Sequence, residues 1–255
     1  MPPTDITDTV EAELPDSSQL AAAFVDLSRA VNDGKDMVEI LTMLAERCVQ
    51  VLHIAACGIL VIDPRGELEV IGSSNHSAHL LDLFQVQNVE GPCLECCRDG
   101  EPVIDLELSP SGPWPGFAAA TLAQGYRAVY AMPLAARGVV VGALNLFAES
   151  ALTAERATVA QALADAATIA LLQVDPREDA TVVTRRLHLV VEERNTIEQA
   201  KGMLAQRFTI DADAAFLRLR DAAGRTRSRL IDVARSVVTR DETHPAAPLL
   251  TDQRE

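Results

Sequence analysis

The stretch that decides the fold runs from residue 128 to residue 147 and reads AVYAMPLAARGVVVGALNLF. It holds two apolar runs, 128–134 and 139–147, of the kind that form buried strands. Arg137 and Gly138 lie between the runs, and glycine accepts the positive φ that a tight turn requires. The pattern predicts a β-hairpin, the most strand-like pair in the chain.

A second hairpin is expected upstream. The apolar runs 57–62 and 68–71 are joined by Asp63-Pro64-Arg65-Gly66. In such a turn proline fixes φ and glycine accepts a positive φ, so the chain reverses direction there.

Helical patterns surround the two hairpins. Apolar residues recur every three or four positions over 20–52, with a break near Asn32-Asp33-Gly34, and again over 152–174. Short helices are expected at 79–84, 93–98 and 117–123, because Gly and Pro clusters separate these segments. The order predicts an α+β domain over 18–174, built on an antiparallel sheet with helices on its faces. Residues 1–17 are expected to be a disordered acidic tail.

A charged break at 175–179 precedes a long helix near 183–208. Its apolar positions follow a four-three alternation that is typical of a homodimeric coiled coil, although a core helix in a monomeric bundle gives nearly the same stripe. Asp211 is expected to cap a second helix that ends at Gly224, and Thr226 or Ser228 a third; residues 241–255 are expected to be disordered. The expected dimer contacts are Leu187, Val190, Arg194, Ile197 and Leu204.

The charge is unevenly distributed along the chain. The net charge of -15 would by itself argue against a nucleic-acid partner. Residues 1–175 hold 8 Lys and Arg against 24 Asp and Glu, whereas residues 176–240 hold 13 against 9. The acidic total therefore conceals one basic segment of net +4.

Several classes of protein are disfavoured by what the sequence lacks. The chain has no apolar run long enough to span a membrane and no signal peptide, so a cytoplasmic protein without a membrane partner is expected. The nucleotide-binding, zinc-protease and serine-hydrolase motifs are missing, and we expect no enzyme activity.

The cysteines are interpreted as thiols. Five Cys in a chain without a secretory signal argue against a disulfide framework. Cys93, Cys96 and Cys97 with His76 and His79 lack the spacing of a zinc site, so no metal is expected. Thiols lining a core or pocket are favoured over a redox-active pair.

The basic segment favours a nucleic-acid partner. Six arginines fall within eighteen residues, and an Arg-x-Arg-x-Arg run stands at the expected start of the last helix. Arginine forks and the free N–H groups of a helix N-terminus both favour phosphate. These arginines are Arg218, Arg220, Arg225, Arg227, Arg229 and Arg235.

Two stretches resemble known families. The sequence IEQAKGML at 197–204, AAFxxLRxA at 214–222 and LxDVA at 230–234 together resemble the ANTAR domain, an RNA-binding three-helix module of transcription antitermination regulators. Upstream, EGPC at 90–93, WPxF at 114–117, PL at 133–134 and VGALNL at 141–146 resemble a GAF sensory domain.

The ANTAR resemblance implies a homodimer that binds paired hairpins in a nascent transcript, so that a terminator cannot form. It implies surface contacts from Ala200, Lys201, Arg220 and the turn 226–229; with the arginine cluster, the RNA-binding set is Ala200, Lys201, Arg218, Arg220, Thr226, Arg227 and Arg229. Many relatives carry Asn where this chain has Arg227, which would alter loop specificity.

The GAF resemblance implies a sensor of a small molecule or of redox state. The expected pocket lining is Cys93, Trp114, Phe117, Tyr130, Met132 and Asn145, although each could be plain core. Three alternatives stay open: a GAF domain that only dimerises, a sensor that acts through protein partners, and a DNA-binding regulator.

Overall fold

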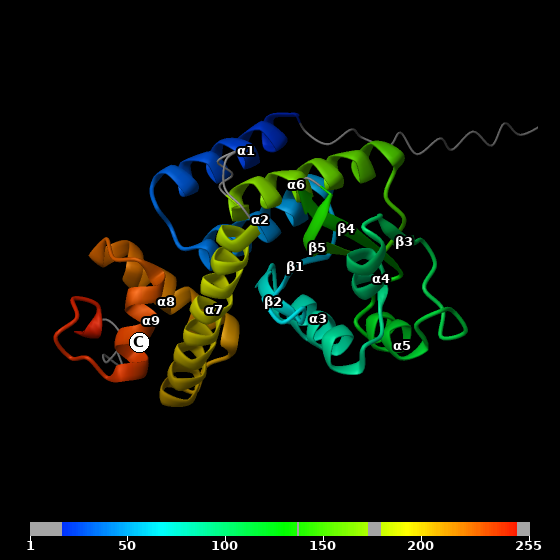
Figure 1. The fold of residues 1–255 in the computed structure, drawn as a ribbon. Helices are drawn as coiled ribbons and strands as arrows, with labels where there is room; N and C mark the ends of the chain where they lie inside the picture. Colours follow the sequence, from blue (N-terminus) through cyan, green and yellow to red (C-terminus); the bar gives the residue numbers. More distant parts are fainter. Residues whose placement is uncertain (1–16, 137, 173–179, 249–255) are drawn as a thin grey trace, which may run out of the picture.

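The computed structural model describes residues 17–136, 138–172 and 180–248. A sheet domain comes first, followed by three C-terminal helices (Figure 1). The sheet domain consists of α1 (Ser17–Asn32), α2 (Met37–Leu52), β1 (Ala56–Ile62), β2 (Leu68–Ser73), α3 (His76–Asn88), α4 (Pro92–Asp99), β3 (Val103–Asp105), α5 (Pro115–Ala123), β4 (Ala128–Ala136), β5 (Val139–Ala148) and α6 (Ala154–Leu172). The C-terminal helices are α7 (Ala180–Phe208), α8 (Ala212–Thr226) and α9 (Leu230–Thr239).

The sheet has five antiparallel strands in the order β2-β1-β5-β4-β3. Both predicted hairpins, β1–β2 and β4–β5, are confirmed, and they meet where β1 pairs with β5. Strand β3 pairs with β4 at one edge and was not predicted. The α+β architecture expected from the sequence is therefore confirmed.

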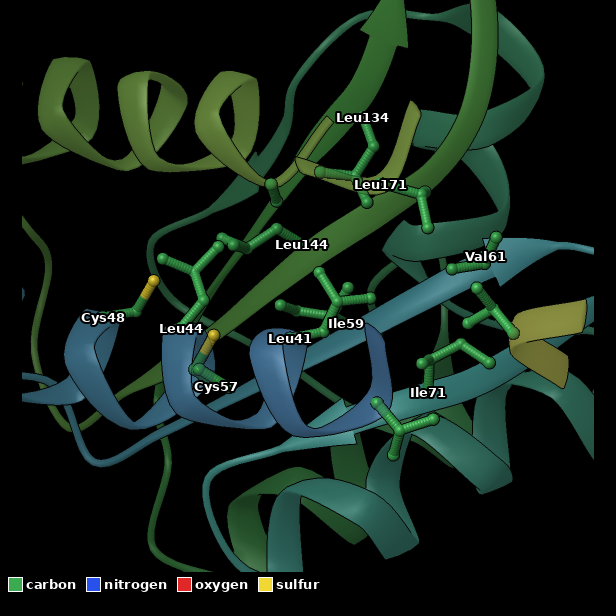
Figure 2. Packing of buried hydrophobic residues seen from close by; sticks show 14 of the residues in the cluster. Leu41, Leu44, Cys48, Cys57, Ile59, Val61, Ile71, Leu134, Leu144 and Leu171 are labelled. Carbon is green, nitrogen blue, oxygen red and sulfur yellow. The ribbon is translucent and has the colours of Figure 1, made fainter. Parts of the chain in front are cut away.

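Both faces of the sheet are covered, which explains why its strands read as continuous apolar runs. Helices α2 and α6 cover one face, and α3, α4 and α5 lie over the other (Figure 1). Figure 2 shows the first face, where Leu41 and Leu44 of α2 pack against Ile59 of β1 and Leu144 of β5.

The stripe on α7 packs within the chain. Leu187, Val190, Ile197 and Leu204 are all buried, because α8 and α9 pack on α7 and this helix also contacts α2 and α6. The stripe therefore matches the core-helix alternative that the sequence left open. Homodimerisation stays a prediction and would use another surface of this conformation or require α7 to be uncovered.

Two predicted helix ends are wrong. Helix α8 continues through Gly224 to Thr226, and its C-cap is Arg227, which adopts a left-handed conformation with φ 54°. The N-cap of α9 is Arg229, whereas the hydroxyl of Thr226 bonds to the carbonyl of Ala222 at 2.7 Å. The loop between α8 and α9 therefore consists of residues 227–229.

The predicted termini differ in part from the structure. Asp241 begins a set of turns that extends to residue 248, and Ala246 is fully buried, so the predicted disorder is wrong for residues 241–248. The other disordered segments predicted at the ends, 1–16 and 249–255, and the linker 175–179, lie outside the described residues.

Candidate nucleic-acid interface and ligand pocket

Three charged side chains of α7, of which Arg194 and Lys201 are buried and Glu198 is partly buried, form a row between the two parts of the chain. Glu198 pairs with Arg194 at 2.5 Å and with Lys201 at 2.8 Å. Burial lowers the pKa of Arg194, and burial together with the nearby Arg194 charge lowers the pKa of Lys201. The row is thus a compensated internal network, with one carboxylate serving two cations.

The expectation that Ala200 and Lys201 lie on the surface is contradicted. Ala200 is fully buried, and only 8% of Lys201 is exposed. The ammonium group of Lys201 lies 5.7 Å from the ring centroid of Phe216, on α8. Both residues lie on the face of α7 that α8 covers, so in this conformation neither offers a contact to RNA.

The arginines at the α8–α9 turn are accessible. Arg227 and Arg229 are exposed. Within the described residues the side chain of Arg227 has no hydrogen-bond or ion-pair partner, whereas its backbone N–H bonds to the end of α8. Arg225 pairs with Asp221 of its own helix, at 3.6 Å, and both side chains are exposed. A phosphate could therefore reach Arg225 and Arg227 without displacing any other part of the fold.

The two arginines on α8 are engaged already. Arg218 stacks over the Phe208 ring with 3.9 Å from its guanidinium carbon to the centroid. Arg220 forms an ion pair with Glu46 of α2 at 3.0 Å. The predicted RNA-binding residues therefore do not form one surface, since they divide into a buried pair, an engaged pair and an accessible turn.

Arg229 also contacts the sheet domain. Its guanidinium pairs with the carboxylate of Asp36 and, at 3.2 Å, with Glu193 of α7. The second oxygen of Asp36 accepts a hydrogen bond of 2.8 Å from the backbone N–H of Ile231, in the first turn of α9. No local sequence pattern indicates this contact, because Asp36 lies 193 positions before Arg229.

The expected pocket residues lie on different faces of the sheet. Tyr130 and Met132 point to the face covered by α2 and α6, whereas Cys93 and Asn145 lie on the opposite face. Trp114 and Phe117 belong to another buried cluster, beside α3 and α5. The six side chains do not line a common pocket: Asn145 pairs with Ala131 and shares its face, so Tyr130 and Met132, on either side of Ala131, point to the opposite face.

A buried polar cluster that was not predicted lies beside Asn145. Asp82 of α3 accepts hydrogen bonds from the amide groups of Asn145, at 2.8 Å, and Gln85, at 3.2 Å. Gln85 in turn accepts from the backbone N–H of Cys93 at 3.0 Å. Burial raises the pKa of Asp82 to about 7. Asp82 Oδ2 and Asn145 Oδ1 have no hydrogen-bond partner among the described residues.

The cluster depends on a glycine in β1. A Cβ atom on Gly58 would lie 1.7 Å from Asp82 Oδ2, so no other residue fits without displacing the Asp82 carboxylate. The Asp82 side chain therefore packs directly on the sheet, against Gly58 of β1 and beside Asn145, the β5 residue that pairs with Gly58. Three elements, β1, α3 and β5, build this site, and its two unpaired acceptor oxygens suit a ligand that carries hydrogen-bond donors.

The five cysteines are free thiols. Cys93 and Cys96 are buried, and Cys97 is partly buried. A hydrogen bond with Cys97 and burial raise the pKa of Cys93 well above its usual value, and burial raises that of Cys96 to about 12. Since the thiolate is the reactive form, Cys93 and Cys96 are poor nucleophiles at neutral pH.

The described residues hold neither a candidate metal site nor a candidate membrane span. In the part of the chain with assigned positions, no three His, Cys, Asp or Glu side chains form a group able to hold a metal ion. None of the helices described is both long and apolar enough to cross a membrane.

Comparisons with known proteins identify both parts. The model of the GAF domain family matches residues 34–172, and that of the ANTAR domain family matches residues 185–238. The search of curated proteins returned no match.

Among solved structures, the GAF domain of a phosphoenolpyruvate-protein phosphotransferase from Coxiella burnetii is 19% identical, with a TM-score of 0.48 over 62% of this chain and 96% of that one. The corresponding domain from Acinetobacter is 14% identical, with a TM-score of 0.48 over 64% and 99%. A free methionine-R-sulfoxide reductase from Neisseria meningitidis, in complex with its substrate, is 16% identical, with a TM-score of 0.44 over 68% and 90%. The family matches cover more than half of the sequence: the chain belongs to the GAF family and joins a GAF domain to an ANTAR domain, the arrangement of a sensor-regulator.

Proposed function

We propose that this chain is a cytoplasmic, non-catalytic regulator that binds paired RNA hairpins through the α8–α9 turn of its ANTAR domain and promotes transcription antitermination. The observation that carries the proposal is the exposed basic turn around Arg227, in a protein whose other surfaces are mostly acidic. Phosphate contacts supply most of the affinity for nucleic acid, and RNA loops are read by shape and backbone contacts. An acidic sheet domain would repel RNA from the rest of the surface.

The GAF domain is proposed to sense a small molecule with hydrogen-bond donors, which would reach the fully buried Asp82 cluster only if the packing of α3 on β1 opens. The support is the pair of unpartnered buried oxygens on Asp82 and Asn145. Each such oxygen is costly in the folded protein unless a donor meets it. A redox signal at Cys93 is less favoured, because its raised pKa keeps the thiol protonated.

The active form is proposed to be a homodimer, since two hairpins in tandem match a two-fold symmetric protein. Sedimentation velocity of the full chain, with and without a two-hairpin RNA, tests this directly. A single monomeric species at all concentrations and with RNA bound would contradict it.

Hairpin binding is tested by titrating the full chain with a two-hairpin RNA and with duplex DNA of the same length, at about 50 and about 200 mM salt. We expect RNA to bind more tightly than DNA and its affinity to fall steeply with salt. Arg227→Ala should weaken RNA binding and reduce the salt slope by about one. The matched control is Arg98→Ala, an exposed arginine of the GAF domain that pairs with Asp99.

Two outcomes would replace the proposal. Equal or tighter binding of duplex DNA would favour a DNA-binding regulator. No binding of either nucleic acid would favour a sensor that acts through protein partners. Binding of such a partner to an apolar surface should depend little on salt.

A further inference from the structure

Asp36 stands at the N-cap of α2 but does not cap its own helix. Its backbone is extended, as at an ordinary N-cap, yet its side chain makes no capping hydrogen bond within α2. Both carboxylate oxygens point to the ANTAR domain, one to the guanidinium of Arg229 and the other to the N–H of Ile231. Only 1% of Asp36 is exposed, so this contact is shielded from water.

The carboxylate completes an end that α9 cannot complete by itself. The N-cap residue of α9 is Arg229, which carries no acceptor, and its side chain makes no capping bond. Asp36 supplies the missing acceptor from the GAF domain. An anion at this place faces both a guanidinium and a backbone N–H at a helix N-terminus. These two groups would bind a phosphate oxygen as well as they bind a carboxylate oxygen.

Glu46 makes a second contact of the same kind from the same helix. It lies farther along α2 and pairs with Arg220 of α8 at 3.0 Å. The two pairs differ in burial: the Asp36 side chain is buried, although 51% of the Arg229 side chain is exposed, whereas both Arg220 and Glu46 are partly exposed. A polyanion could displace Glu46 directly, because partly exposed ion pairs are weak, but it could replace Asp36 only if α2 moves away from the ANTAR domain.

We propose that helix α2 of the GAF domain is an intramolecular competitor of RNA, in which the carboxylates of Asp36 and Glu46 occupy the arginines that RNA phosphates would otherwise contact. The inference rests on the proposed RNA-binding function. A phosphate and Asp36 cannot both take Arg229 and the N–H of Ile231, so the conformation described here binds RNA weakly through these residues. RNA binding and separation of α2 from the ANTAR domain then favour each other by population shift.

The test uses the full chain with Asp36→Asn, Glu46→Gln and the double variant. Two probes are titrated, a two-hairpin RNA and inorganic polyphosphate, and hydrogen exchange of the Ile231 amide reports whether α9 has lost its cap. The matched control is Glu39→Gln, which removes the same charge from α2 although Glu39 pairs with Lys35 and not with the ANTAR domain.

We expect Asp36→Asn and Glu46→Gln each to tighten binding of both probes by about three- to tenfold, with Glu39→Gln close to the wild type. Exchange at Ile231 should accelerate in Asp36→Asn. Unchanged affinity of both variants for both probes, or an equal gain in Glu39→Gln, overturns the proposal. If Asp36→Asn fails to fold, Glu46→Gln decides, because Glu46 is on the surface.

The two hypotheses fail differently. If no variant binds hairpin RNA while the two α2 variants still bind polyphosphate more tightly than the wild type, the RNA function is wrong and the competition for the arginines stands. If the wild type and all variants bind RNA with one affinity, the RNA function stands and the competition is wrong.

Discussion

His79 Nδ1 of the GAF domain lies 3.4 Å from the Nη2 atom of Arg194 in the ANTAR domain. His79 is on α3, the helix that also carries Asp82 and Gln85 of the buried polar cluster. One helix therefore connects the proposed ligand site to the charged row of α7. A ligand that moved α3 would alter the contact with Arg194 directly.

The first prediction concerns the protonation of His79. Burial, Arg194 and Lys201 lower its pKa to about 4, against an opposing effect of Glu198. A folded pKa below the unfolded value means that protons bind the unfolded chain more tightly, so stability is lost as pH falls from about 6.5 towards about 4. His79→Gln should reduce this loss by about 1–2 kcal/mol between pH 7 and pH 4.5, after allowance for screening. Urea unfolding at the two pH values measures it, and identical pH slopes for both proteins would contradict it.

Asp82 should act in the opposite direction. Burial raises its pKa to about 7, so the folded state holds this proton more tightly than the unfolded chain does. Its contribution to stability is therefore complete below about pH 4 and is lost as pH rises through about 7. Asp82→Asn, whose amide oxygen can still accept from Asn145 and Gln85, should unfold at higher urea than the wild type at pH 8. The expected gain is about 2–3 kcal/mol.

The same variant should differ little from the wild type at pH 5, where Asp82 is largely protonated. A gain of equal size at both pH values would mean that the charge of Asp82 is not its cause. Asp63→Asn is a suitable contrast: Asp63 accepts bonds from the backbone of Arg65 and Glu67, and its pKa is lowered, so this variant should lose stability at pH 8.

Gly58 provides a test of how closely Asp82 sits on the sheet. Gly58→Ala places a methyl group against Asp82 Oδ2 and should cost about 2–4 kcal/mol of unfolding free energy. In an Asp82→Ala background the same change should cost much less, because the clashing carboxylate is gone. A double-mutant cycle by urea unfolding gives the coupling. Equal costs in the two backgrounds would place the strain elsewhere.

The sheet was predictable because its turns carry their own chemistry. Between β1 and β2, Asp63 accepts hydrogen bonds from the N–H groups of Arg65 and Glu67, and Gly66 adopts φ 89°, as the Asp-Pro-Arg-Gly sequence indicates. Strand β3 was missed since three residues, only partly buried, show no periodicity. The six pocket residues could not be grouped from local patterns, because the strand pairing decides that Asn145 shares the face of Ala131 and not that of Tyr130 and Met132.

Contacts between distant segments could not be predicted from local patterns. Nothing near Asp36 or Glu46 in the sequence distinguishes them from other acidic surface residues, and only the packing of α2 against the ANTAR domain gives them partners. The end of α8 shows the same effect. Gly224 is the better C-cap by conformational preference, yet the helix ends at Arg227, where α9 must begin to pack on α7.

The last prediction separates Lys201 from Arg227. Family resemblance assigns both to RNA, but the ammonium group of Lys201 is bonded to Glu198 and buried against α8. Lys201→Met keeps the length of the side chain and should lower the free energy of unfolding by about 1–3 kcal/mol, since Glu198 loses one of its two cations. Its hairpin affinity should stay within about twofold of the wild type, a difference of less than about 0.5 kcal/mol.

Arg227→Ala should show the reverse pattern. Its affinity for the hairpin should fall markedly, and its free energy of unfolding should stay within about 0.5 kcal/mol of the wild type, because the Arg227 side chain is exposed. Urea unfolding and RNA titration of both variants decide between the two roles. A loss of affinity in Lys201→Met with unchanged stability would show that α7 turns this lysine outward when RNA binds.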